Sequence, residues 1–324
     1  LEGMQSELRH NVVKRTKFSV FSNLILNFGF ALGYLTAFLW SALRMSAGTL
    51  TFGGMTAFLQ LVAKIQGPAR NLTKLVPAFV SVFTAAERLM ELEENPLEEQ
   101  GEPIYLNKAE GGVGIKFSNV TYAYDDGKRN VIDNLTFDFK PNSCTAILGE
   151  TGAGKTTIVR LILALLHPVK GNVTIYNKVE EKDISPRIRC NLVYVPQGNT
   201  LLSGSIRDNL RMGRLNATDE EMYAALDKAC AGFVKELPDG LATNCAEAGG
   251  GLSEGQAQRI AIARALLREG SVMIFDEATS ALDPETERTL LKNLLGEHSH
   301  TIIFITHRPA VVDYCDNVLR IGNE

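Results

Sequence analysis

The sequence has 324 residues, of which 45% are hydrophobic and 22% are charged, and its formal net charge is −4. This length suffices for two domains with hydrophobic cores of their own, and the mild acidity gives no indication of a nucleic-acid partner. The cysteines show neither C-x-x-C pairing nor metal-ligand spacing, so we expect reduced, partly buried thiols of a cytosolic region. They are Cys144, Cys190, Cys230, Cys245 and Cys315.

The first predicted element is a helix that crosses a membrane. Residues 18–43 contain no Asp, Glu, Lys, Arg or His, and as a helix they would span roughly 39 Å, enough for a hydrocarbon core of about 30 Å. Residues 1–17 are polar and basic, which is not the pattern of a signal peptide and which places this end in the cytoplasm. A buried helix of a soluble protein is the alternative, but such helices rarely stay free of charge for so long.

A second helical stretch follows a turn at residues 46–54 and runs from about Met55 to Glu94. Its first part is apolar, and three basic residues interrupt the rest. Charged residues in a membrane helix usually face a bundle interior or a water-filled cavity. The other interpretation is that this half lies near the cytoplasmic headgroups, and both remain open.

The pattern changes at about Gly112, where short β-rich runs begin to alternate with helical stretches. This alternation is typical of an α/β domain built on a parallel sheet. We therefore expect an α-helical transmembrane hairpin at residues 1–94, a charged linker at 95–111 and an α/β P-loop NTPase domain at 112–324.

A phosphate-binding loop is predicted at residues 149–156, which read G-x-x-x-x-G-K-T between an apolar strand and an apolar helix. The glycines let backbone N–H groups wrap phosphates, and the helix N-terminus adds its dipole. Lys155 is expected to reach the β- and γ-phosphates, and the Thr156 hydroxyl to ligate Mg²⁺. The strand–loop–helix context disfavours a chance glycine-rich turn. The predicted nucleotide contacts are Gly149, Glu150, Thr151, Gly152, Ala153, Gly154, Lys155, Thr156 and Thr157.

Two carboxylates end the apolar run "SVMIFDE" at residues 271–277. Beside a phosphate loop, Asp276 is expected to bind Mg²⁺. Glu277 is then free to take a proton from a water that attacks the γ-phosphate. A strand ending in Asp-Glu is a weak signal alone, and the phosphate loop makes it specific.

A second phosphate-type feature is predicted in "GGGLSEGQAQRIAIARALL" at residues 249–267. Ser253 is expected to cap a helix, with Gln256 completing a capping box. Glycines before the helix, and Gly255 within it, leave the backbone approachable. A helix N-terminus of this kind favours a phosphate, although the chain already has a phosphate loop.

In order and spacing these motifs resemble the ATP-binding-cassette (ABC) family, specifically its exporter half-transporters. The matching stretches are "GETGAGKTT", "VPQ", "LSEGQ", "FDEATSALD" and "ITHR". The resemblance implies ATP and Mg²⁺ as cofactors and an ATPase coupled to export of a substrate across a membrane. It also implies that two cassettes dimerise head to tail, so that Ser253, Gly255 and Gln256 of one contact the ATP held by the other.

The resemblance assigns roles to further residues. Gln197 would sense Mg²⁺ and the attacking water, His307 would contact the γ-phosphate, and Asp283 would lie along the dimer interface. Tyr124 matches the adenine-stacking aromatic, with Tyr122 as a rival on the same strand face. The predicted catalytic residues are thus Lys155, Gln197, Glu277 and His307, and the predicted metal ligands are Thr156, Gln197 and Asp276.

The sequence departs from the family pattern in three ways. Glu254 replaces the usual glycine in the signature, and we expect its side chain to point outward. Thr243 and Asn244 stand where exporters tend to have Thr-Glu, in a loop that touches the membrane domain of the partner. We therefore do not assign this coupling contact to the chain. Such half-transporters have six membrane helices, of which two are expected here; we therefore expect a part of a longer chain, unable to transport alone.

The expected partners are a second half-transporter subunit, membrane lipid and a transported substrate of unidentified class. The presence of Glu277 favours a homodimer, with a heterodimer as the alternative. The expected location is the plasma (inner) membrane, with the cassette in the cytoplasm. Two other functions remain open: a membrane-tethered cassette that binds ATP with little turnover, which Glu254 and Asn244 would support, and a non-transport ABC ATPase, which the charge-free run disfavours.

Overall fold

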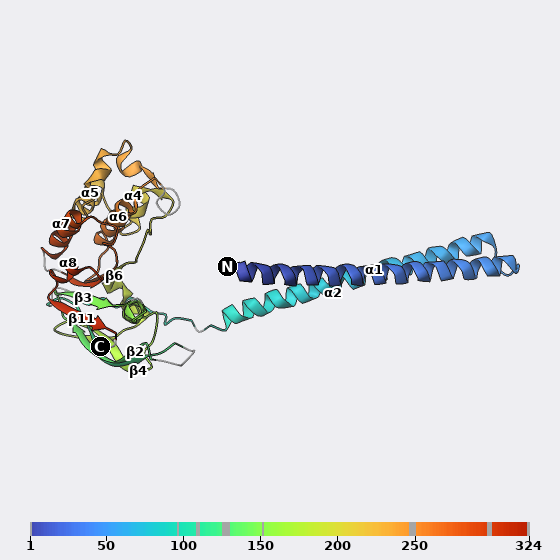
Figure 1. Ribbon diagram of the computed structural model, residues 1–324, viewed down its shortest axis with the longest axis horizontal. Coiled ribbons are helices and arrows are strands. Elements are labelled where there is room, and N and C mark those ends of the chain that lie inside the picture. Colours follow the sequence, from blue (N-terminus) through green and yellow to red (C-terminus); the bar gives the residue numbers. More distant parts are fainter. Residues whose placement is uncertain are drawn as a thin grey trace. The chain divides into compact units, whose positions relative to one another are not determined.

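The computed structural model describes residues 2–95, 97–107, 111–124, 130–150, 152–245, 251–296 and 300–322. The chain divides into two units, Leu1–Pro96 and Leu97–Glu324. The first unit is a pair of long helices, and the second contains the strands and shorter helices of the described chain (Figure 1).

The helical unit is a hairpin of α1 (Glu2–Ser46) and α2 (Phe52–Glu93). Its helices run antiparallel: the Trp40 and Phe58 rings lie 5.3 Å apart, and the Gln66 side chain donates a hydrogen bond to the Phe30 carbonyl at 3.2 Å. Thr51 caps α2, because its hydroxyl accepts the N–H of Gly54. The helix pair expected from the sequence is confirmed.

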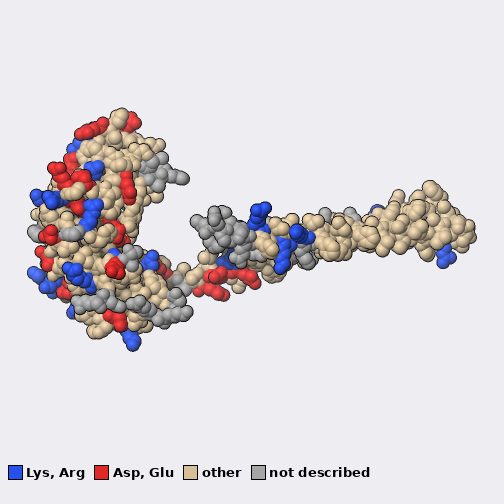
Figure 2. Space-filling model, in the orientation of Figure 1, with Lys and Arg blue, Asp and Glu red and all other residues tan. Residues whose placement is uncertain are grey.

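The apolar part of α1 lies at Val20–Ser46, with a mean hydropathy of 1.5. Within the described residues it is the one stretch that is long and apolar enough to cross a membrane, and only 6% of its apolar 18-residue window is buried against the rest of the chain. On the face shown in Figure 2, the middle of the hairpin carries few charged residues. Membrane crossing by α2 stays a prediction.

The second unit is built on five parallel strands in the order β11-β3-β10-β9-β6. Their bounds are β3 Cys144–Gly149, β6 Leu192–Val195, β9 Val272–Asp276, β10 Thr301–Ile305 and β11 Asn317–Ile321. The parallel sheet core expected from the sequence is confirmed, with β11 as an edge strand that the sequence pattern did not single out.

Both faces of this sheet are covered, and alternate residues of each central strand enter different cores. In β9, Met273 and Phe275 belong to one hydrophobic cluster, and Val272 and Ile274 belong to the other. This explains why the central strands read as continuous apolar runs. The second cluster lies under α3 (Lys155–Ile162).

An antiparallel sheet packs beside the second cluster, in the order β2-β1-β4-β5. The sequence predicted β1, β2 and β4 as strands but did not predict β5, and it did not separate these strands from the parallel sheet. Their bounds are β1 Gly114–Tyr122, β2 Ile132–Phe139, β4 Lys170–Tyr176 and β5 Glu181–Asp183.

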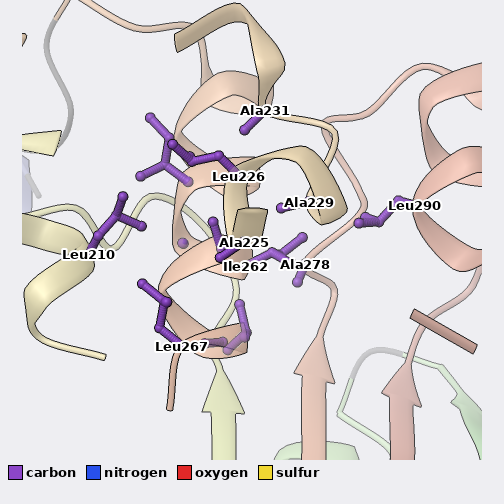
Figure 3. Close-up of a cluster of buried hydrophobic side chains, with 14 of the residues drawn as sticks. Leu210, Ala225, Leu226, Ala229, Ala231, Ile262, Leu267, Ala278 and Leu290 are labelled. Carbon is purple, nitrogen blue, oxygen red and sulfur yellow. The ribbon is translucent and has the colours of Figure 1, made fainter. Parts of the chain in front are cut away.

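The first cluster fills the helical part of the unit, where side chains of α4, α5 and α7 gather around α6 (Figure 3). Small residues such as Ala225, Ala229 and Ala278 line this packing, so the helices approach closely. The helices are α4 Ile206–Arg211, α5 Asp219–Lys228, α6 Glu254–Leu266, α7 Pro284–Leu295 and α8 Pro309–Val312. The remaining elements are β7 Gly204–Ser205, β8 Asn244–Cys245 and the 3₁₀ turns Pro186–Asn191, Gly232–Glu236 and Gly240–Ala242.

Part of the segment expected to be a linker is packed on the second unit. The Leu106 side chain is 4% exposed, and its N–H donates to the Asn191 side chain at 2.9 Å. Further back, Arg189 forms an ion pair with Glu98 at 2.7 Å. Residues 97–107 therefore belong to the second unit by their contacts, and the boundaries at 94 and 112 remain predictions.

Candidate nucleotide site

The predicted site residues follow the carboxyl ends of four neighbouring strands. Gly149 ends β3, while Gln197, Glu277 and His307 come just after β6, β9 and β10. Because parallel strands present their carboxyl ends at one edge of the sheet, the fold brings these four segments together.

The phosphate loop joins β3 to α3. Gly152 and Gly154 have φ values of 87° and 105°, a region that favours glycine. No side chain caps the N-terminus of α3, so its first-turn N–H groups remain available for an anion. Thr151 lies outside the described residues.

Lys155 forms hydrogen bonds back to the first residues of the phosphate loop. Its ammonium group donates to the carbonyl oxygens of Gly149 at 2.6 Å and Glu150 at 2.9 Å. The same group is a mobile cation on a long stem, able to leave these carbonyls for a phosphate oxygen. Next to it, Thr156 is exposed.

The structure distinguishes the two candidate aromatics. The Tyr122 side chain is 8% exposed, whereas Tyr124 is 37% exposed, and their rings meet edge to face with centroids 5.1 Å apart. The Tyr124 hydroxyl lies 3.3 Å from the buried Thr157 hydroxyl and accepts from Arg160 at 3.1 Å. Tyr124 is therefore fixed against α3 with part of its surface open, and its role with adenine stays a prediction.

Asp276 is a buried carboxylate, 8% exposed, at the end of β9. Burial raises the pKa of Asp276, and the neighbouring charge of Glu277 raises it further. The hydrogen bond from the Tyr194 hydroxyl and the charge of Lys155 lower it in part. The Tyr194 hydroxyl donates to the carboxylate at 3.0 Å. A buried, ionisable oxygen ligand of this kind suits Mg²⁺. Sequence reasoning missed Tyr194, which lies in the strand just before the "VPQ" motif.

Glu277 lies between two other predicted catalytic residues. The Gln197 amide donates to its Oε2 at 2.6 Å, and His307 Nδ1 lies 3.3 Å from its Oε1. Its backbone has a φ of 49°, uncommon for a residue other than glycine. The Glu277 N–H donates to the Ile305 carbonyl at 2.9 Å, which ties this conformation to the end of β10. The fold thus brings Gln197, Glu277 and His307 together.

Arg308 fastens the loop after β9 to the loop after β10. Its guanidinium donates to the carbonyls of Ser280 at 2.5 Å and Leu282 at 3.1 Å, and to Glu287 at 3.2 Å. The Glu287 side chain is 2% exposed and the Arg308 side chain 31%, so the ion pair is partly buried. Asp283, between these groups, caps α7 by accepting the Thr286 N–H at 3.0 Å. Sequence reasoning identified Arg308 only as part of the "ITHR" motif and assigned it no role.

The signature region begins α6 as predicted. The Ser253 hydroxyl accepts the Gln256 N–H at 3.2 Å, and the Gln256 side chain accepts the Ser253 N–H at 2.9 Å, which confirms the capping box. Gly255 has a packing role, since a Cβ there would lie 2.7 Å from the Ala281 carbonyl oxygen. Glu254 is exposed. Within the described residues, no hydrogen bond joins Ser253, Gly255 or Gln256 to the phosphate loop.

Comparison with known proteins gives a consistent result. Residues 132–280 match the sequence model of the ABC transporter family. The chain is 33% identical over 325 residues to "Iron-sulfur clusters transporter ATM1, mitochondrial" of Kluyveromyces lactis, covering 98% of this chain and 45% of the relative. It is 36% identical over 282 residues to "Beta-(1-->2)glucan export ATP-binding/permease protein NdvA" of Brucella melitensis, covering 85% of this chain and 46% of the relative.

Among solved structures, the chain is similar to "Structure of a bacterial Atm1-family ABC exporter with ATP bound", with a TM-score of 0.72 and 29% identity. That alignment covers 93% of this chain and 54% of the solved chain. The chain therefore spans about half the length of the relatives it matches.

Proposed function

This chain contains an ABC transporter ATP-binding domain, and from that premise we propose that it is the ATP-hydrolysing part of a half-transporter that drives export across a membrane. The observation that carries the proposal is the arrangement of Gln197, Glu277 and His307 beside a P-loop, with contacts of 2.6 Å and 3.3 Å to the Glu277 carboxylate.

ATP would bind with its phosphates at the loop of residues 149–157. The positive-φ glycines and the uncapped N-terminus of α3 fit this use. Lys155 would exchange its carbonyl partners for phosphate oxygens, and the exposed part of Tyr124 would meet the adenine. Thr156, Gln197 and Asp276 would hold Mg²⁺, and the buried Asp276 carboxylate fits a cation. When bound, Mg²⁺ supplies positive charge to the phosphate oxygens.

Glu277 would act as the general base. Its carboxylate would take the proton of the water that attacks the γ-phosphate. Gln197 and His307 each contact one of its two oxygens, so they fix its orientation. His307 is 65% exposed and so is able to reach a phosphate as well.

The complete site would form between two chains. Ser253, Gly255 and Gln256 start α6 without a hydrogen bond to their own phosphate loop within the described residues, which suits a contact with the nucleotide of a partner. A chain with Glu277 in place can supply a full half-site, so we propose a homodimer. Closure would then depend on the γ-phosphate, and hydrolysis would reopen the pair.

The membrane part of the proposal rests on α1. Its apolar stretch follows a basic N-terminal segment, so the N-terminus would lie on the cytoplasmic side. With α2 crossing back, as we propose, the ATP-binding unit would lie on that side too. The proposed location is the plasma (inner) membrane, with lipid around the helices. The two relatives are named for different cargoes, so the proposal does not include one.

The test separates ATP binding from turnover in the full chain purified in detergent. Glu277→Gln should bind ATP as tightly as the wild type, because the amide keeps the shape, but turnover should fall by about 100-fold or more because the base is lost. Glu269→Gln, at an exposed glutamate elsewhere, is the matched control and should change neither quantity. Undiminished turnover in Glu277→Gln would contradict the assigned role, and tight binding without turnover in the wild type would favour a regulatory cassette.

A further inference from the structure

Two of the five cysteines meet at the start of strands β3 and β11. Cys144 is the first residue of β3, and Cys315 lies in the turn just before β11. Their sulfur atoms lie 2.7 Å apart, although 171 positions separate the two residues in sequence. Both are free thiols.

The backbone holds the two residues in this position. The Cys144 N–H donates to the Asp316 carboxylate at 2.8 Å, and the Asp316 N–H donates to the Cys144 carbonyl at 2.9 Å. The ladder then continues with Asn317 opposite Thr145. A disulfide has an S–S distance of roughly 2.05 Å, so the sulfur atoms need to approach by less than about 1 Å, a movement that side-chain rotation can supply.

The two thiols differ in accessibility. Cys144 is 3% exposed, and the cavity beside it is about 40 Å³, too small for a peptide-sized reagent. The hydrogen bond with Cys315, together with burial, raises the pKa of the Cys144 thiol. Cys315 is only partly buried, so a reagent from solvent reaches Cys315 first.

We propose that Cys144 and Cys315 form a redox-modification site, at which a low-molecular-weight disulfide oxidises the two thiols to an intramolecular disulfide. The Cys315 thiolate attacks one sulfur of the small disulfide, forming a mixed disulfide and releasing one small thiol, which takes up the proton that Cys315 lost. The Cys144 thiolate then attacks the Cys315 sulfur and releases the second small thiol, which takes up the Cys144 proton. Two protein thiols are oxidised, and the small disulfide is reduced to two thiols.

The new bond would join the strand that leads into the phosphate loop to the last strand of the sheet. The other end of β11 is already close to that loop, because the Ile321 carbonyl fills the space where a Gly149 side chain would stand. A covalent link between such distant positions restricts the unfolded chain. The oxidised protein should therefore unfold at a temperature several degrees higher than the reduced protein.

The experiment uses the reduced full chain in detergent, incubated with excess glutathione disulfide. The protein is then unfolded in denaturant, so that buried thiols also react. Remaining thiols are alkylated, and the digested protein is analysed by mass spectrometry. We expect alkylation to be lost from Cys144 and Cys315 in equal proportion, with one linked peptide pair that contains both. Cys190, Cys230 and Cys245 should stay alkylated.

Two variants complete the test. Cys315→Ser should lose both the linked peptide and the rise in melting temperature, whereas the matched variant Cys230→Ser should keep both. Two results would overturn the proposal: full alkylation of both thiols after oxidation, and glutathione that stays on Cys315 without transfer to Cys144. The peptide map of the wild type needs no substitution, so a poorly folded variant would not hide either result.

Discussion

At the scale of single residues, the neighbouring carboxylates Asp276 and Glu277 lie in different surroundings. Asp276 points into the domain as the last residue of β9 and accepts a hydrogen bond from Tyr194. The positive φ of Glu277 breaks the strand alternation, so its carboxylate reaches Gln197 and His307 instead. One backbone conformation thus gives two adjacent acids separate surroundings, which suit the tasks proposed for them, cation ligand and base.

Asp276→Asn should raise the melting temperature near neutral pH by a few degrees while abolishing turnover. The raised pKa of Asp276, caused chiefly by burial, shows that the folded chain disfavours the charged carboxylate. Asparagine removes that charge and can still accept from Tyr194. The measurement is thermal unfolding of the full chain in detergent, with and without the substitution.

The melting-temperature difference between Asp276→Asn and the wild type should depend on pH. With a raised pKa, the folded chain binds a proton where the unfolded chain does not, so the wild type gains stability as the pH falls from neutral towards the ordinary carboxyl range. The difference in melting temperature between Asp276→Asn and the wild type should therefore become smaller over that pH range. Asp283 behaves in the opposite way and serves as the comparison within the same chain. The hydrogen bond from the Thr286 N–H lowers its pKa, so the stability that Asp283 contributes is lost on acidification. An advantage of Asp276→Asn that grew on acidification would contradict this account.

At the scale of elements, two features position α6: the capping box at its N-terminus and the packing of its first turn against a neighbouring loop. Its capping box satisfies first-turn donors, and its flank packs on the loop after β9 so closely that only glycine fits at position 255. Arg308 then holds the same loop to the end of β10. The loop after β9 therefore contacts both α6 and the residue after His307, so direct contacts link α6, Asp283 and His307 within one chain.

Gly255→Ala should destabilise the protein by about 1–3 kcal/mol, because the new methyl group meets the Ala281 carbonyl, a backbone atom that cannot rotate away. Chemical denaturation of the full chain measures the change. The control is Glu254→Ala, one position earlier and exposed, for which a change below about 0.5 kcal/mol is expected. Equal stability of Gly255→Ala and the wild type would show that Gly255 is not held there by packing.

The elements also show what a sequence can predict. The phosphate loop, the two carboxylates and the capping box were predictable because each depends on residues close together in the chain. The partners of Asp276 and Glu277, the Arg308 contacts and the Cys144–Cys315 pair were not, since each joins segments that only the fold brings together. The antiparallel sheet was missed for the same reason: strand runs can be read locally, whereas pairing cannot.

At the scale of the whole molecule, the proposed function divides the nucleotide site into two halves that lie on separate parts of one chain. The phosphate loop, Asp276 and Glu277 would form one half, and the start of α6 would form the other. In the described part of the chain no hydrogen bond joins the two. Two copies placed head to tail would complete two sites, and this proposed arrangement would explain why one chain carries two phosphate-type motifs.

The mass of the Glu277→Gln variant of this chain in detergent, measured by light scattering with and without ATP and Mg²⁺, tests this claim most directly. Slow turnover should trap the closed form, so the protein mass should double when nucleotide is added. Adding Ser253→Arg should abolish the doubling, whereas Thr289→Arg, on the exposed side of α7, should not. A chain that binds ATP yet stays monomeric, or a dimer that Ser253→Arg leaves intact, would contradict a site shared between two copies.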